Sequence, residues 1–285
     1  MMFEEKAKAI YYRVSEKGIE RVESCVIGES RWSLYVNDQE VVTFMATSRN
    51  LHHLALGFLA SEGLIAGLDD IASVRVNLAS DCAYWYIPAL GLNETRSMPV
   101  CEDGVGSIQV RLTRETFILP TRRTITSGCG GGVTFADLSK EQPPIESDIR
   151  VSPAQIFAMM RELIARATLY HECRGVHTSA LADSAADRLL AIAEDVGRHN
   201  TIDKLRGECM MRGISTRDSM LLSTGRISSE MITKASKMQT PIVVSRTSPT
   251  ELAVELAKAW NITLIGYAHA GQMQVYAGLE RIVVE

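Results

Sequence analysis

The sequence predicts a mixed α/β protein with a smaller α+β domain followed by a layered α/β domain. In the first hundred or so residues, β-branched and aromatic side chains alternate with polar ones, as in half-buried strands. From residue 151, strand-like and helix-like segments follow one another in turn. A Gly-rich and Pro-containing stretch separates the two patterns. We therefore expect a small α+β domain over residues 1–120, a cysteine-containing loop and linker over 121–150, and the layered domain over 151–285.

The first domain is predicted to contain strands, one hairpin and one helix. Asn37 and Asp38 lie between two alternating segments and favour a tight hairpin turn. Apolar residues recur at helical spacing from 50 to 64, and Thr47 or Ser48 provides the start signal. The expected strands are 21–27, 32–36, 40–45, 73–77, 83–88 and 107–113.

The second domain is predicted to alternate helices with strands in a mostly parallel sheet. Ser152 and Gln155 form a capping box that begins a helix extending to about Tyr170, and Ser248 to Glu251 form another that begins a helix to Trp260. Ligands of such folds bind beyond the carboxyl ends of the strands. The other expected helices are 201–212 and 229–238, and the expected strands are 179–182, 189–195, 219–223, 242–245, 263–267 and 274–276.

Composition and charge exclude several classes of protein. The 285 residues include 46% hydrophobic and 22% charged side chains, which is typical of folded globular chains and argues against disorder. The net charge of −4 provides no global positive field for DNA or anionic lipid. We expect a cytoplasmic protein, because no long apolar run or signal-peptide pattern occurs. The six cysteines are scattered without paired spacing, which argues against a disulfide framework and predicts mostly reduced thiols.

Cys129 lies in the most unusual local sequence, with Gly128 before it and three glycines after it. Such a run costs backbone entropy on folding, so we expect that the loop needs its flexibility. Arg122 and Arg123 would favour the thiolate, which is the nucleophilic form of cysteine. The alternative is a plain linker that carries an incidental thiol.

Polar residues gather at the ends of three predicted strands in the second domain. The residues that follow the first strand, near 195–199, and the second strand, near 223–226, both precede the start of a helix. Free backbone N–H groups at a helix start, together with arginines, can bind a phosphate. The alternatives are ordinary helix caps at Asn200, Thr201, Ser228 or Ser229 and a surface turn near 268–271. His199 is also a candidate for proton transfer. The candidates are Asp195, Arg198 and His199 after the first strand, Ser223 and Arg226 after the second, and residues 267–272 after the third.

Zinc and dinucleotide motifs are missing from the sequence. No His-x-Glu pair is followed by Pro-Cys-x-x-Cys, as a nucleobase deaminase would need. No Gly-x-Gly-x-x-Gly begins a helix after a strand, as a nicotinamide enzyme would need. We expect no zinc site and no other metal ligands.

An ordered set of motifs spans nearly the whole chain. The motifs are Ser127-Gly128-Cys129-Gly130 and residues 174–180, 194–200, 223–226, 245–250 and 266–276. This set resembles the FdhD family of formate dehydrogenase accessory proteins. The resemblance implies that the second domain has a cytidine-deaminase-like fold without its zinc site. It also implies a sulfur carrier, or sulfurtransferase, which receives persulfide sulfur from a cysteine desulfurase. Such a carrier passes the sulfur to the bis-molybdopterin guanine dinucleotide form of the molybdenum cofactor, which formate dehydrogenase requires.

The resemblance also assigns roles to particular residues. It implies that Cys129 carries the persulfide. Many family members have Cys-x-x-Cys at this loop, whereas Gly132 stands at the second position here, so disulfide exchange within the loop is impossible. A persulfide carrier needs only one nucleophilic cysteine, so the absence of the second cysteine is compatible with the carrier role. The segment implied to bind the guanine dinucleotide consists of Tyr267, Ala268, His269, Ala270, Gly271 and Gln272.

The expected function is therefore sulfur transfer to the molybdenum cofactor, which is bound as substrate. The expected partners are a cysteine desulfurase and a formate dehydrogenase, with no DNA and no membrane, and a homodimer is left open. Three alternatives remain. They are a non-catalytic cofactor chaperone that does not need Cys129, a regulatory guanine-nucleotide-binding module, and a metal-free or divergent deaminase.

Overall fold

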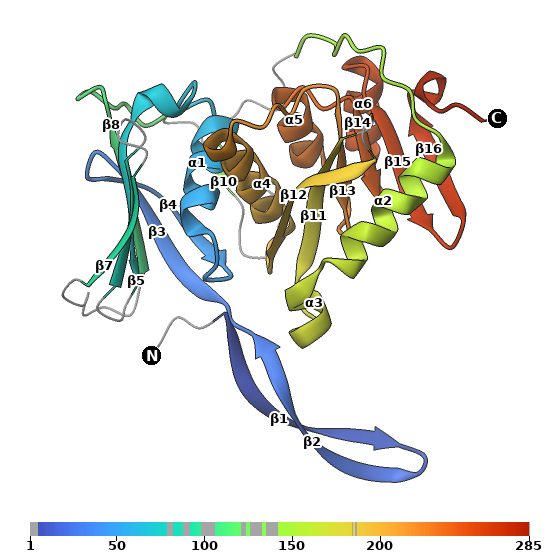
Figure 1. Ribbon diagram of the computed structural model, residues 1–285, viewed down its shortest axis with the longest axis horizontal. Helices are drawn as coiled ribbons and strands as arrows, with labels where there is room; N and C mark the ends of the chain where they lie inside the picture. Colours follow the sequence, from blue (N-terminus) through green and yellow to red (C-terminus); the bar gives the residue numbers. More distant parts are fainter. Residues whose placement is uncertain are drawn as a thin grey trace.

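Two six-stranded sheets with helices packed against them and a long two-stranded arm make up the part of the molecule that the structure describes (Figure 1). The computed structural model describes residues 5–78, 82–87, 92–97, 106–120, 124–125, 133–134, 142–183, 185 and 187–284. This is the mixed α/β architecture that the sequence predicts. No helix in these ranges is long and apolar enough to cross a membrane.

The first sheet has the strand order β4-β3-β8-β5-β6-β7 and packs against helix α1 (Figure 1). Asn37 and Asp38 have positive φ of 46° and 67° at the turn between β3 and β4, which confirms the predicted tight hairpin. Trp32 is fully buried at the centre of this core. The elements are β3 (Ser30–Val36), β4 (Gln39–Ala46), α1 (Leu51–Ser61), η1 (Leu68–Asp70), β5 (Ile71–Leu78), β6 (Cys82–Ile87), β7 (Leu92–Ser97) and β8 (Gly106–Leu112).

Helix α1 begins at Leu51, within one residue of the predicted start, but its N-cap lies two or three residues beyond the predicted capping signal. Its N-cap is Asn50, in the left-handed region with φ 52°, and that side chain makes no capping bond. The prediction of Thr47 or Ser48 is wrong because Thr47 is used elsewhere. The Thr47 amide donates to Asp195 Oδ2 at 3.1 Å, and the Thr47 hydroxyl accepts from the Val196 amide at 3.3 Å. A long-range contact thus replaces the local cap.

Helix α1 crosses helix α4 (Arg198–Arg212) closely and joins the two halves of the molecule. Two glycines permit this approach. A Cβ atom on Gly57 would overlap the backbone of Asp203, and one on Gly207 would overlap the backbone of His53. The helices therefore touch through their backbones, and any side chain at either glycine would force them apart.

The second sheet has the strand order β12-β11-β13-β14-β15-β16. The pairs β13·β14 and β14·β15 are parallel, whereas β11·β12, β11·β13 and β15·β16 are antiparallel. The prediction of a mostly parallel sheet is therefore wrong. β12 follows β11, and β16 follows β15, after connections of a few residues, and such short connections can join only antiparallel neighbours. The strands are β11 (His177–Asp183), β12 (Arg188–Asp195), β13 (Ser219–Ser223), β14 (Ile242–Ser245), β15 (Thr263–His269) and β16 (Gln272–Ala277).

The helices of this half follow their sequence signals only in part. The capping box of α2 (Pro153–Ala165) is confirmed: the Gln155 amide donates to Ser152 Oγ at 3.3 Å, and the Ser152 amide donates to Gln155 Oε1 at 2.8 Å. The expected single helix to Tyr170 is instead divided, and α3 (Thr168–Cys173) follows as a separate turn. The second capping box does not form, since the N-cap of α6 (Glu251–Ala259), Thr250, makes no side-chain bond. Remaining elements are α5 (Ser229–Lys237), η3 (Leu279–Arg281), β9 (Thr124–Ile125) and β10 (Val133–Thr134).

The arm consists of β1 (Lys6–Ser15) and β2 (Gly18–Ile27), which form a sheet of their own and extend away from both halves (Figure 1). The sequence predicts only the second strand, over 21–27. Cys25 at the base of the arm forms a disulfide with Cys173 at the end of α3. The expectation that the scattered cysteines are unpaired is therefore wrong for these two residues. Their separation of 148 residues gives no sequence signal.

Candidate functional site

One edge of the second sheet brings the candidate site residues together. β12 ends at Asp195, which pairs with His177 at the start of β11. β13 ends at Ser223, which pairs with Ser245 at the end of β14. The carboxyl end of β15 adjoins that of β14 in the same parallel set. This is the edge at which sheets of this kind bind ligands.

Buried hydroxyl groups form the floor of this edge. Ser179 Oγ lies 2.7 Å from Thr201 Oγ1 and 3.2 Å from Ser223 Oγ. Ser223 Oγ also accepts from the Gly225 amide at 3.1 Å, and Ser245 Oγ donates to the Gly225 carbonyl at 2.7 Å. Ser223 is fully buried. The structure therefore places Ser223 beneath the loop that follows β13, where it supports that loop and does not face a ligand.

Asp195 is also a supporting residue in this structure. Its carboxylate is 0% exposed and accepts from the Thr47 amide at 3.1 Å and the Gly197 amide at 2.8 Å. It further accepts from Asn200 Nδ2 at 2.8 Å and from Lys204 Nζ at 2.6 Å. Four donors satisfy both carboxylate oxygens, so Asp195 fastens the loop before α4 to the first half of the molecule and lies out of reach of a ligand.

The buried Arg198 and the half-buried His177 both lie close to Gly225, in the loop that follows β13. A Cβ atom on Gly225 would lie 3.2 Å from Arg198 Cβ and 3.0 Å from His177 Nδ1, so the loop approaches closely because residue 225 is glycine. Burial and the nearby Arg198 guanidinium lower the pKa of His177. The imidazole of His177 is therefore neutral and lies near the guanidinium of Arg198. His177 was not among the sequence candidates, although it begins a buried strand within one of the family motifs.

His199 connects two helices through both of its ring nitrogens. Nε2 lies 3.1 Å from Ser228 Oγ, and Nδ1 lies 3.3 Å from Glu230 Oε2. Burial lowers the pKa of His199 to about 4, although Glu230 opposes the shift. His199 is thus neutral at pH 7 and holds α4 against α5, a role different from the expected proton transfer. Neither Asn200 nor Thr201 caps α4, whose N-cap is Gly197.

Arg226 is the exposed cation of the group. It follows Gly225 and precedes α5, and its side chain is exposed to solvent. Its neighbour Ile227 is held firmly, since the Ile227 amide donates to the Ser248 carbonyl at 3.2 Å and the Thr250 amide donates to the Ile227 carbonyl at 2.9 Å. A firmly held backbone therefore presents an exposed arginine at the ligand-binding edge.

A cavity of about 310 Å³ lies where the turn between β15 and β16 meets α2. Small-molecule sites start at about this size. The turn is tightly bent, with positive φ at Tyr267, Ala270 and Gly271, and Tyr267 is 40% exposed beside the cavity lining. Four of the six residues in the segment expected to bind the guanine dinucleotide thus line one cavity. Its lining comprises Phe157, Met160, Arg161, Ile164, Arg246, Ala268, His269, Ala270 and Gly271.

Two arginines and an apolar wall of this cavity were missed by sequence reasoning. Phe157, Met160 and Ile164 recur at helical spacing on α2, a pattern that indicates core packing just as well. Arg161 lies on the same helix, and Arg246 follows the end of β14. Two sequence signals could have indicated Arg246: it follows a predicted strand, and it lies within the family motif 245–250. An apolar wall with two cations can hold a flat ring that carries an anionic group.

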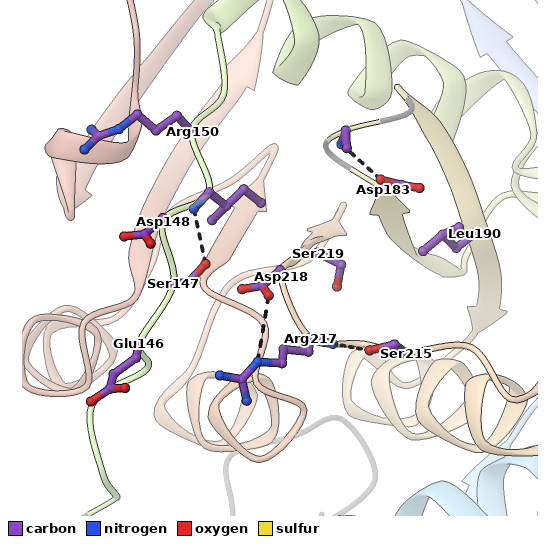
Figure 2. A pocket seen from close by; sticks show the side chains of 12 residues that line it. Glu146, Ser147, Asp148, Arg150, Asp183, Leu190, Ser215, Arg217, Asp218 and Ser219 are labelled. Atoms are coloured by element: carbon purple, nitrogen blue, oxygen red, sulfur yellow. Dashed lines mark hydrogen bonds and ion pairs between the residues drawn. The ribbon is translucent and has the colours of Figure 1, made fainter.

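A second, larger hollow of about 1000 Å³ lies at the opposite edge of the sheet, where β13 begins (Figure 2). Asp183 at the end of β11 pairs there with Ser219 at the start of β13. Figure 2 shows carboxylates and arginines intermixed, with Arg217 Nε 3.8 Å from Asp218 Oδ2. None of the sequence candidates lines this hollow. Within the ranges that the structure describes, no cluster of three or more His, Cys, Asp or Glu residues could hold a metal ion.

Comparison with known proteins identifies the family. The FdhD/NarQ family model matches residues 27–283. The chain belongs to the FdhD/NarQ family. It is 33% identical over 277 residues to the sulfur carrier protein FdhD of Bacillus subtilis strain 168, and the match covers 95% of each chain. It is also 33% identical over 267 residues to the sulfur carrier protein FdhD of Listeria innocua, and that match covers 92% of this chain and 93% of the other.

A solved structure of this family has the same overall fold. The putative formate dehydrogenase accessory protein from Desulfotalea psychrophila is 25% identical to this chain and superposes with a TM-score of 0.71. The match covers 98% of this chain and 100% of the other. The cytidine-deaminase likeness of the second half stays a prediction.

The loop with Cys129 is the remaining candidate of the FdhD/NarQ motif set. Cys129, Arg122 and Arg123 lie outside the described residues. The described backbone on either side is a short antiparallel ladder, in which Ile125 pairs with Val133. The two ends of segment 126–132 are therefore held next to each other. Cys129 stands in the sequence between these two paired residues.

Proposed function

We propose that this chain is a sulfur carrier in formate dehydrogenase maturation and that Cys129 carries the sulfur as a persulfide. The observation that supports the proposal most is the 33% identity to a protein named sulfur carrier protein FdhD over 95% of both chains. The match includes the position of Cys129, since the family model covers residues 27–283.

The loading step is a thiolate exchange. The Cys129 thiolate attacks the terminal sulfur of a persulfide on the donor enzyme, a cysteine desulfurase. The donor's S–S bond breaks, its own cysteine leaves as a thiolate, and a new S–S bond forms on Cys129. No external oxidant or reductant is needed, because one persulfide replaces another. Arg122 and Arg123 near the loop favour the thiolate that starts this step.

Three of the other cysteines are poor competitors for this role. Cys25 and Cys173 are joined in the disulfide at the base of the arm. Cys209 is 1% exposed, and burial raises its pKa to about 12, so it is not a thiolate at neutral pH. A glycine-flanked cysteine between adjacent strand ends is the better nucleophile.

The cavity beside α2 is proposed to hold the guanine nucleotide end of the molybdenum cofactor. Phe157 and its apolar neighbours provide a wall for the flat base, and the segment 267–272 closes the other side. Arg161 and Arg246 line the same cavity and would pair with the diphosphate. Arg226, exposed at the next strand end, would extend this cationic rim.

The test is calorimetric binding of GDP to the wild type and to Arg246→Ala and Arg226→Ala variants. Loss of one charge-assisted contact should weaken binding roughly 10- to 150-fold, which corresponds to about 1.5 to 3 kcal/mol. Melting temperatures should stay close to the wild-type value, because neither side chain is buried. Arg217→Ala is the matched control, since Arg217 lines the hollow at the opposite edge of the sheet. Equal GDP affinity in all four proteins would contradict the placement.

A further inference from the structure

The disulfide between Cys25 and Cys173 is only a short stretch of chain away from the ligand-binding edge. Cys25 belongs to β2 at the base of the arm, and Cys173 is the last residue of α3. β11 begins four residues after Cys173, at His177. Four residues span at most about 14 Å, so the position of Cys173 restrains the start of β11. Both cysteines are half-buried, so a small thiol can reach them from solvent.

The segment between the disulfide and β11 has a strained backbone. Arg174 has φ 59° and ψ −164°, a conformation that usually requires glycine. Gly175 follows with φ 70°, and a Cβ atom there would lie 3.2 Å from Ile27 Cγ2 of the arm. Strained backbone persists only where the surrounding contacts enforce it. Here the arm packs against the segment, and the disulfide holds the two together.

Helix α3 is fixed at its start by contacts that do not involve the arm. The buried Glu194 carboxylate accepts from two backbone amides in the first turn of α3, both at 2.9 Å, and from the Thr168 hydroxyl at 3.1 Å. At the other end of α3, the arm is attached through the disulfide and through an ion pair in which Lys6 Nζ lies 2.7 Å from Glu172 Oε2. Both side chains of this pair are about half exposed, and such pairs contribute little to stability. Reduction of the disulfide would therefore leave the end of α3 weakly held while its start stays in place.

Hydrogen bonds connect β11 to the loop that carries Arg226. The Thr178 amide donates to Thr224 Oγ1 at 3.0 Å, and the Thr224 amide donates to the Thr178 carbonyl at 2.9 Å. The Arg246 amide in turn donates to the Ser223 carbonyl at 3.1 Å, and Arg246 lines the cavity beside α2. A displacement at the start of β11 is therefore transmitted to both of these arginines.

We propose that the Cys25–Cys173 disulfide is a redox switch of the ligand-binding edge. In the oxidised form, the disulfide holds residues 174–178 and the loop 223–226 in the arrangement that binds phosphate groups. In the reduced form, the end of α3 and the strained segment relax, and that arrangement is populated only part of the time. The ligand is that of the proposed function, on which this inference rests.

The switching step is a thiol–disulfide exchange with a dithiol reductant. One thiolate of the reductant attacks a sulfur of the disulfide, the S–S bond between Cys25 and Cys173 breaks, and a mixed disulfide forms. The second thiolate of the reductant attacks the mixed disulfide and releases the protein. The reductant loses two electrons and becomes a disulfide, whereas the protein gains two electrons and two protons and carries two thiols. The reverse reaction with an oxidised dithiol forms the Cys25–Cys173 bond again.

The experiment compares the oxidised and the reduced full chain in GDP binding and in amide hydrogen exchange. Dithiothreitol is the dithiol, and intact mass reports the disulfide through the two hydrogen atoms gained on reduction. We expect the binding arrangement in about 10 to 30% of reduced molecules, so the dissociation constant for GDP should rise about 3- to 10-fold. Exchange of the Thr178 and Thr224 amides should also become faster on reduction, with no ligand present.

Two variants separate the disulfide from the other contacts of the arm. Cys25→Ser/Cys173→Ser should bind GDP as weakly as the reduced wild type, with or without dithiothreitol. Lys6→Ala is the matched control, because it removes the exposed ion pair at the same place and leaves the disulfide intact. It should bind GDP like the oxidised wild type and should respond to dithiothreitol as the wild type does.

Equal amide exchange rates, or equal GDP affinities, in the oxidised and reduced wild type would overturn the proposal. A disulfide that dithiothreitol reduces only after unfolding in urea would overturn it as well. GDP binding in neither state would contradict the proposed function instead, and the exchange rates of the Thr178 and Thr224 amides would then decide whether the redox switch exists.

Discussion

Replacing Lys204 by methionine should destabilise the protein severely without changing the ligand-binding edge. Lys204 is 2% exposed and Asp195 0% exposed, and their Nζ and Oδ2 atoms are 2.6 Å apart. Lys204 Nζ also donates to the Thr47 carbonyl at 3.2 Å and the Glu194 carbonyl at 3.4 Å. Methionine fills a similar volume but leaves a buried carboxylate without its cation. Removing one partner of a buried ion pair costs about 3 to 5 kcal/mol.

Urea unfolding of Lys204→Met, Asp195→Asn and the double variant measures this cost. Each single variant should lose about 3 to 5 kcal/mol in the free energy of unfolding at pH 7, and the double variant should lose less than the sum of both. GDP affinity of the folded protein should stay within about twofold, since the Asp195 carboxylate is fully buried and bonded to groups of the protein. Single variants that lose under about 1 kcal/mol would refute the structural role. Loss of GDP binding by a stably folded Asp195→Asn protein would indicate that Asp195 contacts the ligand.

Two further predictions concern acid and reductant. Burial lowers the pKa of His52 to about 3 and that of His53 to about 4, whereas both side chains take up protons near pH 6.5 in the unfolded chain. The free energy of unfolding should therefore fall as the pH drops from 6.5 toward 4. At pH 5 the loss should be about 2 kcal/mol for each histidine. Urea midpoints at pH 7 and pH 5 check this, and an equal loss in a His52→Gln/His53→Gln variant would contradict it. The disulfide joins two cysteines that are 148 residues apart in the sequence, so it restricts a long loop of the unfolded chain. Reductant should therefore lower the free energy of unfolding of the wild type by up to about 5 kcal/mol. It should have no effect on the Cys25→Ser/Cys173→Ser variant. A wild type whose melting temperature is indifferent to reductant would refute it.

The sequence predicts an element correctly where contacts between residues close in the chain determine its structure. The turn at Asn37 and Asp38 and the capping box at Ser152 and Gln155 involve residues a few positions apart, and both are found as predicted. The strand ends that carry Arg198 and Arg226 also lie at one sheet edge, because that edge follows from the order of strands and helices.

The features that the sequence could not predict depend on distant residues. Thr47 has the chemistry of a helix cap, but it meets Asp195, which is 148 positions away. The same contact turns Asp195 from a candidate ligand into a buried anchor. The first strand of the arm was missed because both of its faces are exposed, so its side chains lack the one-sided pattern of a half-buried strand. The directions of β11 and β16 depend on connection lengths that propensity does not determine with enough accuracy.

Mass spectrometry of the intact protein shows whether Cys129 carries the sulfur. After incubation with a cysteine desulfurase and cysteine, the wild type should gain the mass of one sulfur atom, and peptide analysis should locate it on Cys129. Cys129→Ser should gain none, while Cys209→Ser should behave like the wild type because Cys209 is buried. Sulfur found on another cysteine, or full loading of Cys129→Ser, would contradict the account.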